Sequence, residues 1–211
     1  MPVEFSVAAY RFGHSMIRDD YRINDTVPKL PIFSADPNAG PLDDFRGFRP
    51  LPAGWSIDWQ FFFETGDGTR LQHARKIDAK LSAPTFSLPG LDPPELARRN
   101  LHRGKALGLP SGQRVARAMG IPPLDDNELG AAAVSPAFVG DAPLWFYVLK
   151  EAELTGGNGL GAVGGRVVAE VLLGLLKGDP LSFINVEPNW IPTLAGSDQF
   201  TMPDLIRFVN S

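Results

Sequence analysis

The sequence predicts a mainly α-helical protein with long proline-rich loops and little or no β-sheet. Apolar residues recur at helical spacing in several separate segments, whereas the strict alternation of a β-strand is nearly absent. The 22 glycines and 20 prolines gather between these segments, where they would end helices and form loops. A chain of 211 residues, 44% of them hydrophobic, is long enough and apolar enough for a real core, which excludes a disordered or collagen-like chain.

The N-terminal third is expected to hold two helices and a long irregular segment. Residues 3–18 place apolar side chains one helical turn apart, which predicts the first helix. Residues 19–52 contain six prolines and no clean period, so we expect them to be irregular. Residues 55–63 carry two tryptophans and two phenylalanines at spacings of three or four, which predicts a short helix with an aromatic face.

The middle of the chain shows stronger helix boundaries. Asp92 is a candidate N-cap with Pro93 at the first helical position, for a helix that continues over residues 95–106. Ser111 is a candidate cap for the next helix, which would end near Met119.

Three further helices are expected towards the C-terminus. Residues 144–154 and 163–177 have helical periodicity, and the second of these runs ends at a Gly-Asp-Pro sequence. Thr201 followed by Asp204 resembles a capping box in front of a last, short helix.

Composition removes several classes of function. The net charge is −4 and the pI about 5.4, so nucleic acid and membrane surfaces are not expected partners. Without cysteine, the chain cannot form disulfides, a thiolate nucleophile, an iron–sulfur cluster or a cysteine zinc site. We find neither a signal peptide nor a membrane span, and expect a cytoplasmic protein.

Two pairs of polar residues could carry chemistry. Arg11 precedes His14 by three residues, so a helix would present a cation and an imidazole on one face. Asn100 and Arg103 share a helix face by the same rule, and an Asn carbonyl can orient a metal-ligating histidine through its second ring nitrogen. Spacing alone also allows a partly buried histidine and a solvated, arginine-rich face.

These two pairs lie in segments that resemble the animal-type haem peroxidases, in their bacterial branch. Residues 3–18 are similar to the helix that carries the proximal histidine in that family. The resemblance extends over nearly the whole chain through segments in the same order, at residues 76–81, 100–110, 143–146 and 164–180. One departure follows Arg103, the arginine of the Asn-x-x-Arg pattern. Many members continue with Gly-Arg-Asp-His-Gly, whereas this chain has Gly104-Lys105-Ala106-Leu107-Gly108.

The resemblance implies a haem b site built from the two pairs. His14 would be the proximal ligand of the iron, Asn100 its hydrogen-bond partner, and Arg11 and Arg103 the partners of the haem propionates. Residues 1–211 would then be a single unit, a helical half-domain forming the C-terminal, proximal part of a larger peroxidase domain. The intact enzyme would use hydrogen peroxide and a small reducing donor.

No distal machinery is recognised, so the chain alone is not expected to be a competent peroxidase. Peroxide cleavage needs a distal histidine and arginine, which the family supplies from upstream. We interpret His73 and His102 as surface or structural residues. The apolar stretches 131–146 and 167–176 would have faces for the missing N-terminal half, and self-association is expected without it.

Two alternatives remain from the same residues. Fatty-acid dioxygenases of the superfamily carry a tyrosine three residues before the proximal histidine, where this chain has Arg11. Tyr10 is adjacent, but one residue turns a helical side chain by about 100°, so peroxidase is preferred to dioxygenase. The other alternative is a truncated or degenerate module that keeps the fold without catalysis.

A glycine-rich stretch matches a nucleotide-binding pattern only formally. Residues 159–164 read Gly-x-Gly-x-x-Gly and precede a helix. No convincing strand comes before them and no βαβ context surrounds them, so we favour a turn that lets helices pack closely.

Overall fold

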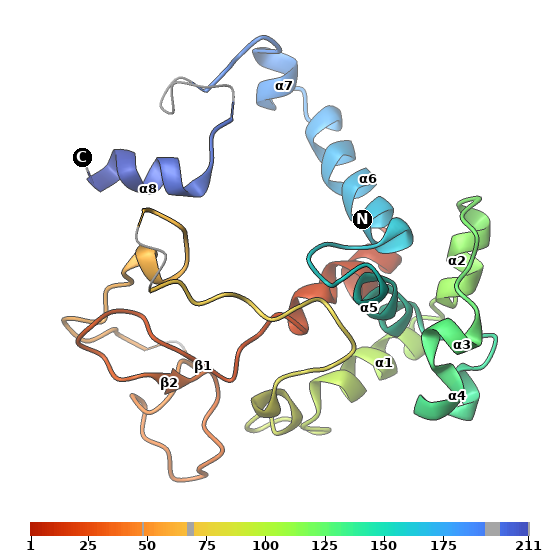
Figure 1. The fold of residues 1–211 in the computed structure, drawn as a ribbon, viewed down its shortest axis with the longest axis horizontal. Helices are drawn as coiled ribbons and strands as arrows, with labels where there is room; N and C mark the ends of the chain where they lie inside the picture. Colours follow the sequence, from red (N-terminus) through yellow and green to blue (C-terminus); the bar gives the residue numbers. More distant parts are fainter. Residues whose placement is uncertain (48, 67–69, 193–198, 211) are drawn as a thin grey trace. The chain divides into compact units, whose positions relative to one another are not determined.

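The computed structural model is mainly helical with one very small sheet, as the sequence predicts. It describes residues 1–47, 49–66, 70–192 and 199–210 (Figure 1). The chain divides into two compact units, the first made of Met1–Arg18 and Arg75–Leu175, the second of Asp19–Ala74 and Leu176–Ser211.

The first unit holds most of the helices. Its elements are the π-helical segment η1 (Glu4–Ala8), the 3₁₀ segments η2 (Ala9–His14), η4 (Ala83–Phe86) and η5 (Pro136–Phe138), and the α-helices α1 (Leu96–Ala106), α2 (Gly112–Ala118), α3 (Asp126–Leu129), α4 (Ala131–Val134), α5 (Leu144–Leu154) and most of α6 (Ala162–Gly178). The second unit holds β1 (Asp20–Tyr21), β2 (Leu30–Pro31), the 3₁₀ segment η3 (Trp59–Phe61), the end of α6, α7 (Phe183–Val186) and α8 (Met202–Asn210).

Helix α5 is the centre of the first unit. Residues 144–149 are all buried, so the helix has an apolar surface on every side. The N-terminal segment, α1, α2 and α3 pack against it (Figure 1). A helix that is apolar all round must be enclosed by other elements, and α5 therefore fixes where these four neighbours lie.

Close approach between α2 and α5 depends on Gly112. A Cβ at Gly112 would lie 1.9 Å from Cγ of Tyr147, a distance that no packed side chain tolerates. The fully buried Tyr147 also accepts a hydrogen bond at its hydroxyl from Leu124 N, at 3.0 Å. The tyrosine thus ties α2 and the loop before α3 to the same turn of α5.

The N-terminal segment is helical, but it is not a regular α-helix. It begins as π-helix and changes at Ala8, whose φ of −123° and ψ of −76° break the regular path, to a 3₁₀ helix that ends at His14. In a 3₁₀ helix, side chains three residues apart eclipse one another. Arg11 and His14 are consequently more nearly stacked along the axis than the predicted α-helix would place them.

Two predicted helices have different boundaries in the structure. Asp92 does not cap α1, which begins at Leu96 with Glu95 at the N-cap. Asp92 and Pro93 each precede a proline, and that position disfavours helical backbone. The aromatic helix expected over 55–63 is reduced to one 3₁₀ turn at Trp59–Phe61, capped by Asp58.

The caps predicted at Ser111 and at Thr201 with Asp204 agree with the structure. Ser111 accepts a hydrogen bond from Arg114 N at the start of α2, at 3.4 Å. In the second unit, the Asp204 carboxylate accepts from Thr201 N at 2.9 Å at the start of α8. Each contact satisfies a backbone or side-chain donor that a helix N-terminus leaves free.

The second unit is largely irregular between its short elements, as expected for residues 19–52. Strands β1 and β2 pair antiparallel, with Asp20 opposite Pro31 and Tyr21 opposite Leu30. Tyr21 and Phe45 pack edge to face, with ring centroids 6.4 Å apart. Aromatic contacts of this kind, rather than a long ladder of backbone hydrogen bonds, hold the loops together.

Exposed apolar residues are concentrated on α6. Leu172, Leu173, Leu175 and Leu176 are exposed, in keeping with the expectation for 167–176. The stretch 131–146 differs, because its last residues enter α5 and are buried, while Val134 and Val139 stay exposed. Among the described residues, no helix combines the length and the apolar character needed to cross a membrane.

We predict that Gly112→Ala destabilises the protein strongly. The added methyl group would overlap the Tyr147 ring, and forced overpacking of this kind costs at least about 2 kcal/mol. Gly174→Ala in α6 is the matched control, because no atom lies within 4 Å of the new Cβ and the substitution gains up to about 1 kcal/mol of helix propensity. Urea unfolding of the two variants measures the difference, and equal stabilities would contradict the packing assigned to α2 and α5.

Candidate functional site

The structure brings His14 and Asn100 into contact across 86 residues of sequence. His14 Nδ1 and Asn100 Nδ2 lie 2.9 Å apart. His14 is the last residue of η2, and Asn100 is in the middle of α1 with only 2% of its surface exposed. A buried amide needs hydrogen-bond partners, and the imidazole supplies one of them.

Arg11 supplies the second partner and is itself firmly held. Its Nη1 donates to Asn100 Oδ1 at 3.2 Å, and its Nε donates to the Ser6 carbonyl at 3.1 Å. The indole Nε1 of Trp145 donates to the Arg11 carbonyl at 3.2 Å, so α5 positions this residue from behind. Arg11, Asn100 and His14 thus form one continuous chain of hydrogen bonds.

The amide of Asn100 has the opposite orientation from the one expected. The sequence predicts that its carbonyl oxygen faces His14, but Arg11 occupies that oxygen and the NH₂ group faces Nδ1 instead. An amide nitrogen can only donate. In this arrangement Nδ1 accepts, and the proton of the neutral imidazole is on Nε2.

Burial and a neighbouring cation favour the neutral form of His14. Desolvation, and then the charge of Arg11, lower the pKa of His14 from its usual 6.5. The pKa of Arg11 is lowered too, by desolvation and then by the charge of Arg103. A neutral imidazole is the form that ligates metals, so the charge of His14 suits ligation, whereas the proton on Nε2 does not.

The guanidinium groups border a cavity of about 580 Å³. Arg11, Arg99 and Arg103 line it together with Asn100 and His102, and no carboxylate is among its lining residues. Helical spacing does not pair Arg99 with either His14 or Asn100, so the sequence does not indicate its place in this cavity. Arg99 turns inward to donate to the backbone carbonyls of Asp92 and Pro93, at 3.3 and 3.5 Å. Several cations without an acid make this cavity suited to an anionic group.

The other residues considered for chemistry are not part of the hydrogen-bonded chain of Arg11, Asn100 and His14. His73 is an exposed residue of the second unit, and His102 is exposed on α1 beside Asn100. Tyr10 is exposed and its ring stacks on Phe5 with centroids 4.7 Å apart. This places the Tyr10 side chain away from the His14 and Asn100 pair that Arg11 joins.

The glycine-rich stretch before α6 holds a carboxylate of the chain itself. Glu151 of α5 is 7% exposed and accepts from Val163 N at 2.9 Å and Gly164 N at 3.1 Å. A Cβ at Gly161 would lie 2.2 Å from Glu151 Cγ. The amides that would receive a phosphate in a nucleotide site are therefore already occupied, and the glycines serve close packing.

Comparison with protein-family models and with curated proteins finds no match to this chain. Within the described ranges, no three His, Asp or Glu side chains are grouped as metal ligands. That arrangement would not be needed at a site with one protein ligand, since haem supplies four nitrogens of its own.

We predict that Glu151→Ala destabilises the fold by about 2 to 3 kcal/mol, because two buried amides lose a charged acceptor. Glu170→Ala is the control. Glu170 pairs with Arg166 on the exposed surface of α6, so its removal is expected to change stability by less than about 0.5 kcal/mol. Thermal or urea unfolding tests this pair of variants, and similar losses from both would refute the capping role of Glu151.

We predict that the pKa of His14 lies below 6.5 and rises in Arg11→Gln, where the nearby positive charge is removed. An NMR titration of the imidazole resonances measures both values. Arg98→Gln removes an exposed arginine of α1 outside the cavity and should leave the pKa of His14 unchanged. A rise in both variants would mean that Arg11 has no specific effect.

The same shift predicts the sign of one contribution to stability. As the pH falls below 6.5, the unfolded chain binds a proton at His14 before the folded chain does. The free energy of unfolding should therefore decrease from about pH 6.5 down to the pKa of the folded state. Denaturant unfolding of the wild type and His14→Gln at a series of pH values measures this difference, which should be absent from the variant.

Proposed function

We propose that this chain provides the proximal side of a haem peroxidase site, with His14 as the axial ligand of the iron. The observation that carries the proposal is the contact between His14 and Asn100, with Arg11 hydrogen-bonded to the same amide. A histidine with one ring nitrogen engaged by a buried side chain is held in a fixed orientation, and its other nitrogen can face a metal.

The types of residue present suit haem b, although His14 does not itself line the cavity that Arg11 and Arg103 border. His14 Nε2 makes no hydrogen bond to a described residue, and the imidazole is neutral at neutral pH. Arg11 and Arg103 border a cavity without acids, which suits two propionates. When bound, haem would supply the redox chemistry of hydrogen peroxide reduction, with a small donor as the source of electrons.

Ligation through Nε2 requires a rearrangement of this chain's own residues. The proton on Nε2 has to move to Nδ1, and Nδ1 then needs an acceptor in place of the Asn100 NH₂ group. A turn of the amide by about 180° presents Oδ1 to His14. Arg11 must first leave Oδ1, and pairing of its guanidinium with a carboxylate would achieve this. Anion binding at Arg11 and metal binding at His14 would then favour each other.

The alternative of a non-catalytic haem-binding or structural module rests on the positions of the other histidines. His102 is exposed on α1, close in sequence to the proximal partner Asn100, and His73 belongs to the second unit. Turnover is therefore proposed only for the chain combined with a separate source of distal groups, and dioxygenase chemistry is disfavoured by Arg11 at the tyrosine position.

Hemin titration followed by absorption tests the proposal. We expect one hemin per chain with the red-shifted Soret band of a histidine-ligated haem, and loss of that shift in His14→Ala. His102→Ala is the matched control, since it removes an exposed histidine that also borders the cavity. Asn100→Ala should weaken retention about 10-fold or more. An unchanged Soret shift in His14→Ala, with circular dichroism showing a folded chain, would contradict the assignment.

The proposed propionate contacts can be tested by changing either the arginines of the protein or the carboxylates of hemin. Arg11→Gln and Arg103→Gln should weaken hemin binding, but they should have little effect on binding of hemin dimethyl ester, which lacks the two negative charges. Arg98→Gln serves as the exposed control. Equal losses for hemin and its ester would show that the arginines act through the fold and not through the carboxylates.

A further inference from the structure

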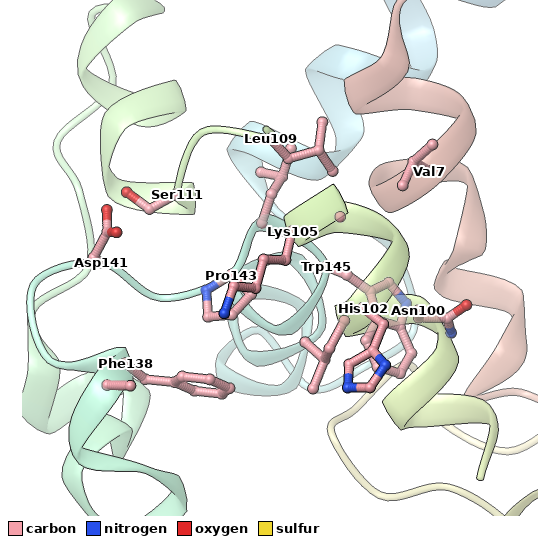
Figure 2. A pocket seen from close by; sticks show the side chains of 14 residues that line it. Val7, Asn100, His102, Lys105, Leu109, Ser111, Phe138, Asp141, Pro143 and Trp145 are labelled. Carbon is pink, nitrogen blue, oxygen red and sulfur yellow. The ribbon is translucent and has the colours of Figure 1, made fainter. Parts of the chain in front are cut away.

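A second cavity, of about 420 Å³, lies in the first unit beside α1, and no arginine is among its lining residues (Figure 2). Its wall contains Leu109, Phe138, Leu144 and Trp145, which give it a mainly apolar surface. The volume falls within the range of small-molecule sites in proteins, about 300 to 1,000 Å³. The cavity is therefore large enough for an aromatic ring system of two fused rings.

One side of the cavity carries a cation that no described residue neutralises. Lys105 of α1 extends into it, and Figure 2 shows Lys105, His102 and the Phe138 ring directed towards the same space. Lys105 forms no ion pair with any described residue. Such an ammonium group at an apolar cavity is a suitable partner for a carboxylate.

The polar groups on the opposite side are already engaged. Asp141 pairs with Arg114, with 3.3 Å between its Oδ1 and the arginine Nε. The Ser111 hydroxyl accepts the capping hydrogen bond from Arg114 N. The charge of Asp141 is thus balanced by an arginine that does not line the cavity, and Lys105 is left as the unbalanced charge.

We propose that this cavity binds a small aromatic carboxylate, with its ring against Phe138 and Leu144 and its carboxylate at Lys105. Burial of the ring supplies most of the binding free energy, because it removes apolar surface from water. Lys105, with a ring N–H of His102 as a second donor, selects the anion over a neutral molecule of the same shape. His14 does not line this cavity, so binding there does not require the proposed iron ligand.

Isothermal titration calorimetry of the haem-free chain with three probes of one shape tests the proposal. The probes are 2-naphthoate, 2-naphthamide and 2-naphthylmethylamine, used at constant ionic strength. We expect 2-naphthoate to bind about tenfold more tightly than the amide, a difference of about 1.4 kcal/mol, and the amine to bind most weakly. Equal affinity for the acid and the amide, or tightest binding of the amine, would overturn the assignment of Lys105.

Variants separate the charge from the cavity. Lys105→Met keeps an unbranched apolar side chain and should bring the affinity for 2-naphthoate down to that for the amide. Lys177→Met, on the exposed end of α6, should change neither. Gly104→Leu should abolish binding of all three probes by filling the cavity, since only Leu109 Cδ1, at 3.4 Å, lies near the new Cβ. Unchanged binding in Gly104→Leu would place the ligand elsewhere.

A last variant distinguishes this proposal from the proposed function. His14→Ala removes the proposed iron ligand, which does not line this cavity, and should retain 2-naphthoate binding. Loss of naphthoate binding in a folded His14→Ala chain would count against a separate site. Failure of hemin to bind the wild type would leave the naphthoate result unaffected.

Discussion

In the first unit, residues 144–149 are buried one after another, so the first half of α5 has no side that faces water and neighbouring segments pack around it. Tyr147 meets Gly112 of α2, Glu151 caps α6, and Trp145 holds the backbone of Arg11. Tyr147 and Glu151 lie one turn apart on the same face of α5, and Trp145 lies on another face. The burial of one helix thus fixes the start of α2, the start of α6 and the course of the N-terminal segment.

The candidate site depends on that packing more than on its own polar groups. His14 and Asn100 come from separate segments that both contact α5. The 3₁₀ geometry of η2 adds a second constraint, because it stacks Arg11 over His14 and allows both to reach one amide. The buried amide of Asn100 has an arginine at its oxygen and an imidazole at its nitrogen. Arg11 can only donate, so the amide oxygen faces Arg11 and the NH₂ group faces His14.

The helices with strong local signals could be predicted from sequence, and those shaped by long-range packing could not. Ser111, Thr201 and Asp204 form capping hydrogen bonds between residues three apart in the sequence, so the sequence pattern predicts these roles. Asp92 looks like an N-cap in the sequence, but Pro93 and Pro94 disfavour helical backbone in the residues before them. Helix α1 therefore begins later, at Leu96. Helical spacing predicts that Arg11 lies near His14 and that Asn100 lies near Arg103. It does not predict the orientation of the Asn100 amide or the hydrogen bond from Arg99 to the Asp92 carbonyl, because both depend on contacts between separate segments.

Asn100 and His102 border both cavities of the first unit, so α1 is a wall shared by two spaces of different chemistry. Helix α1, eleven residues long, therefore borders an apolar cavity that contains a lysine and a cationic cavity that contains three arginines. A substitution at Asn100 or His102 accordingly changes the lining of two cavities at once.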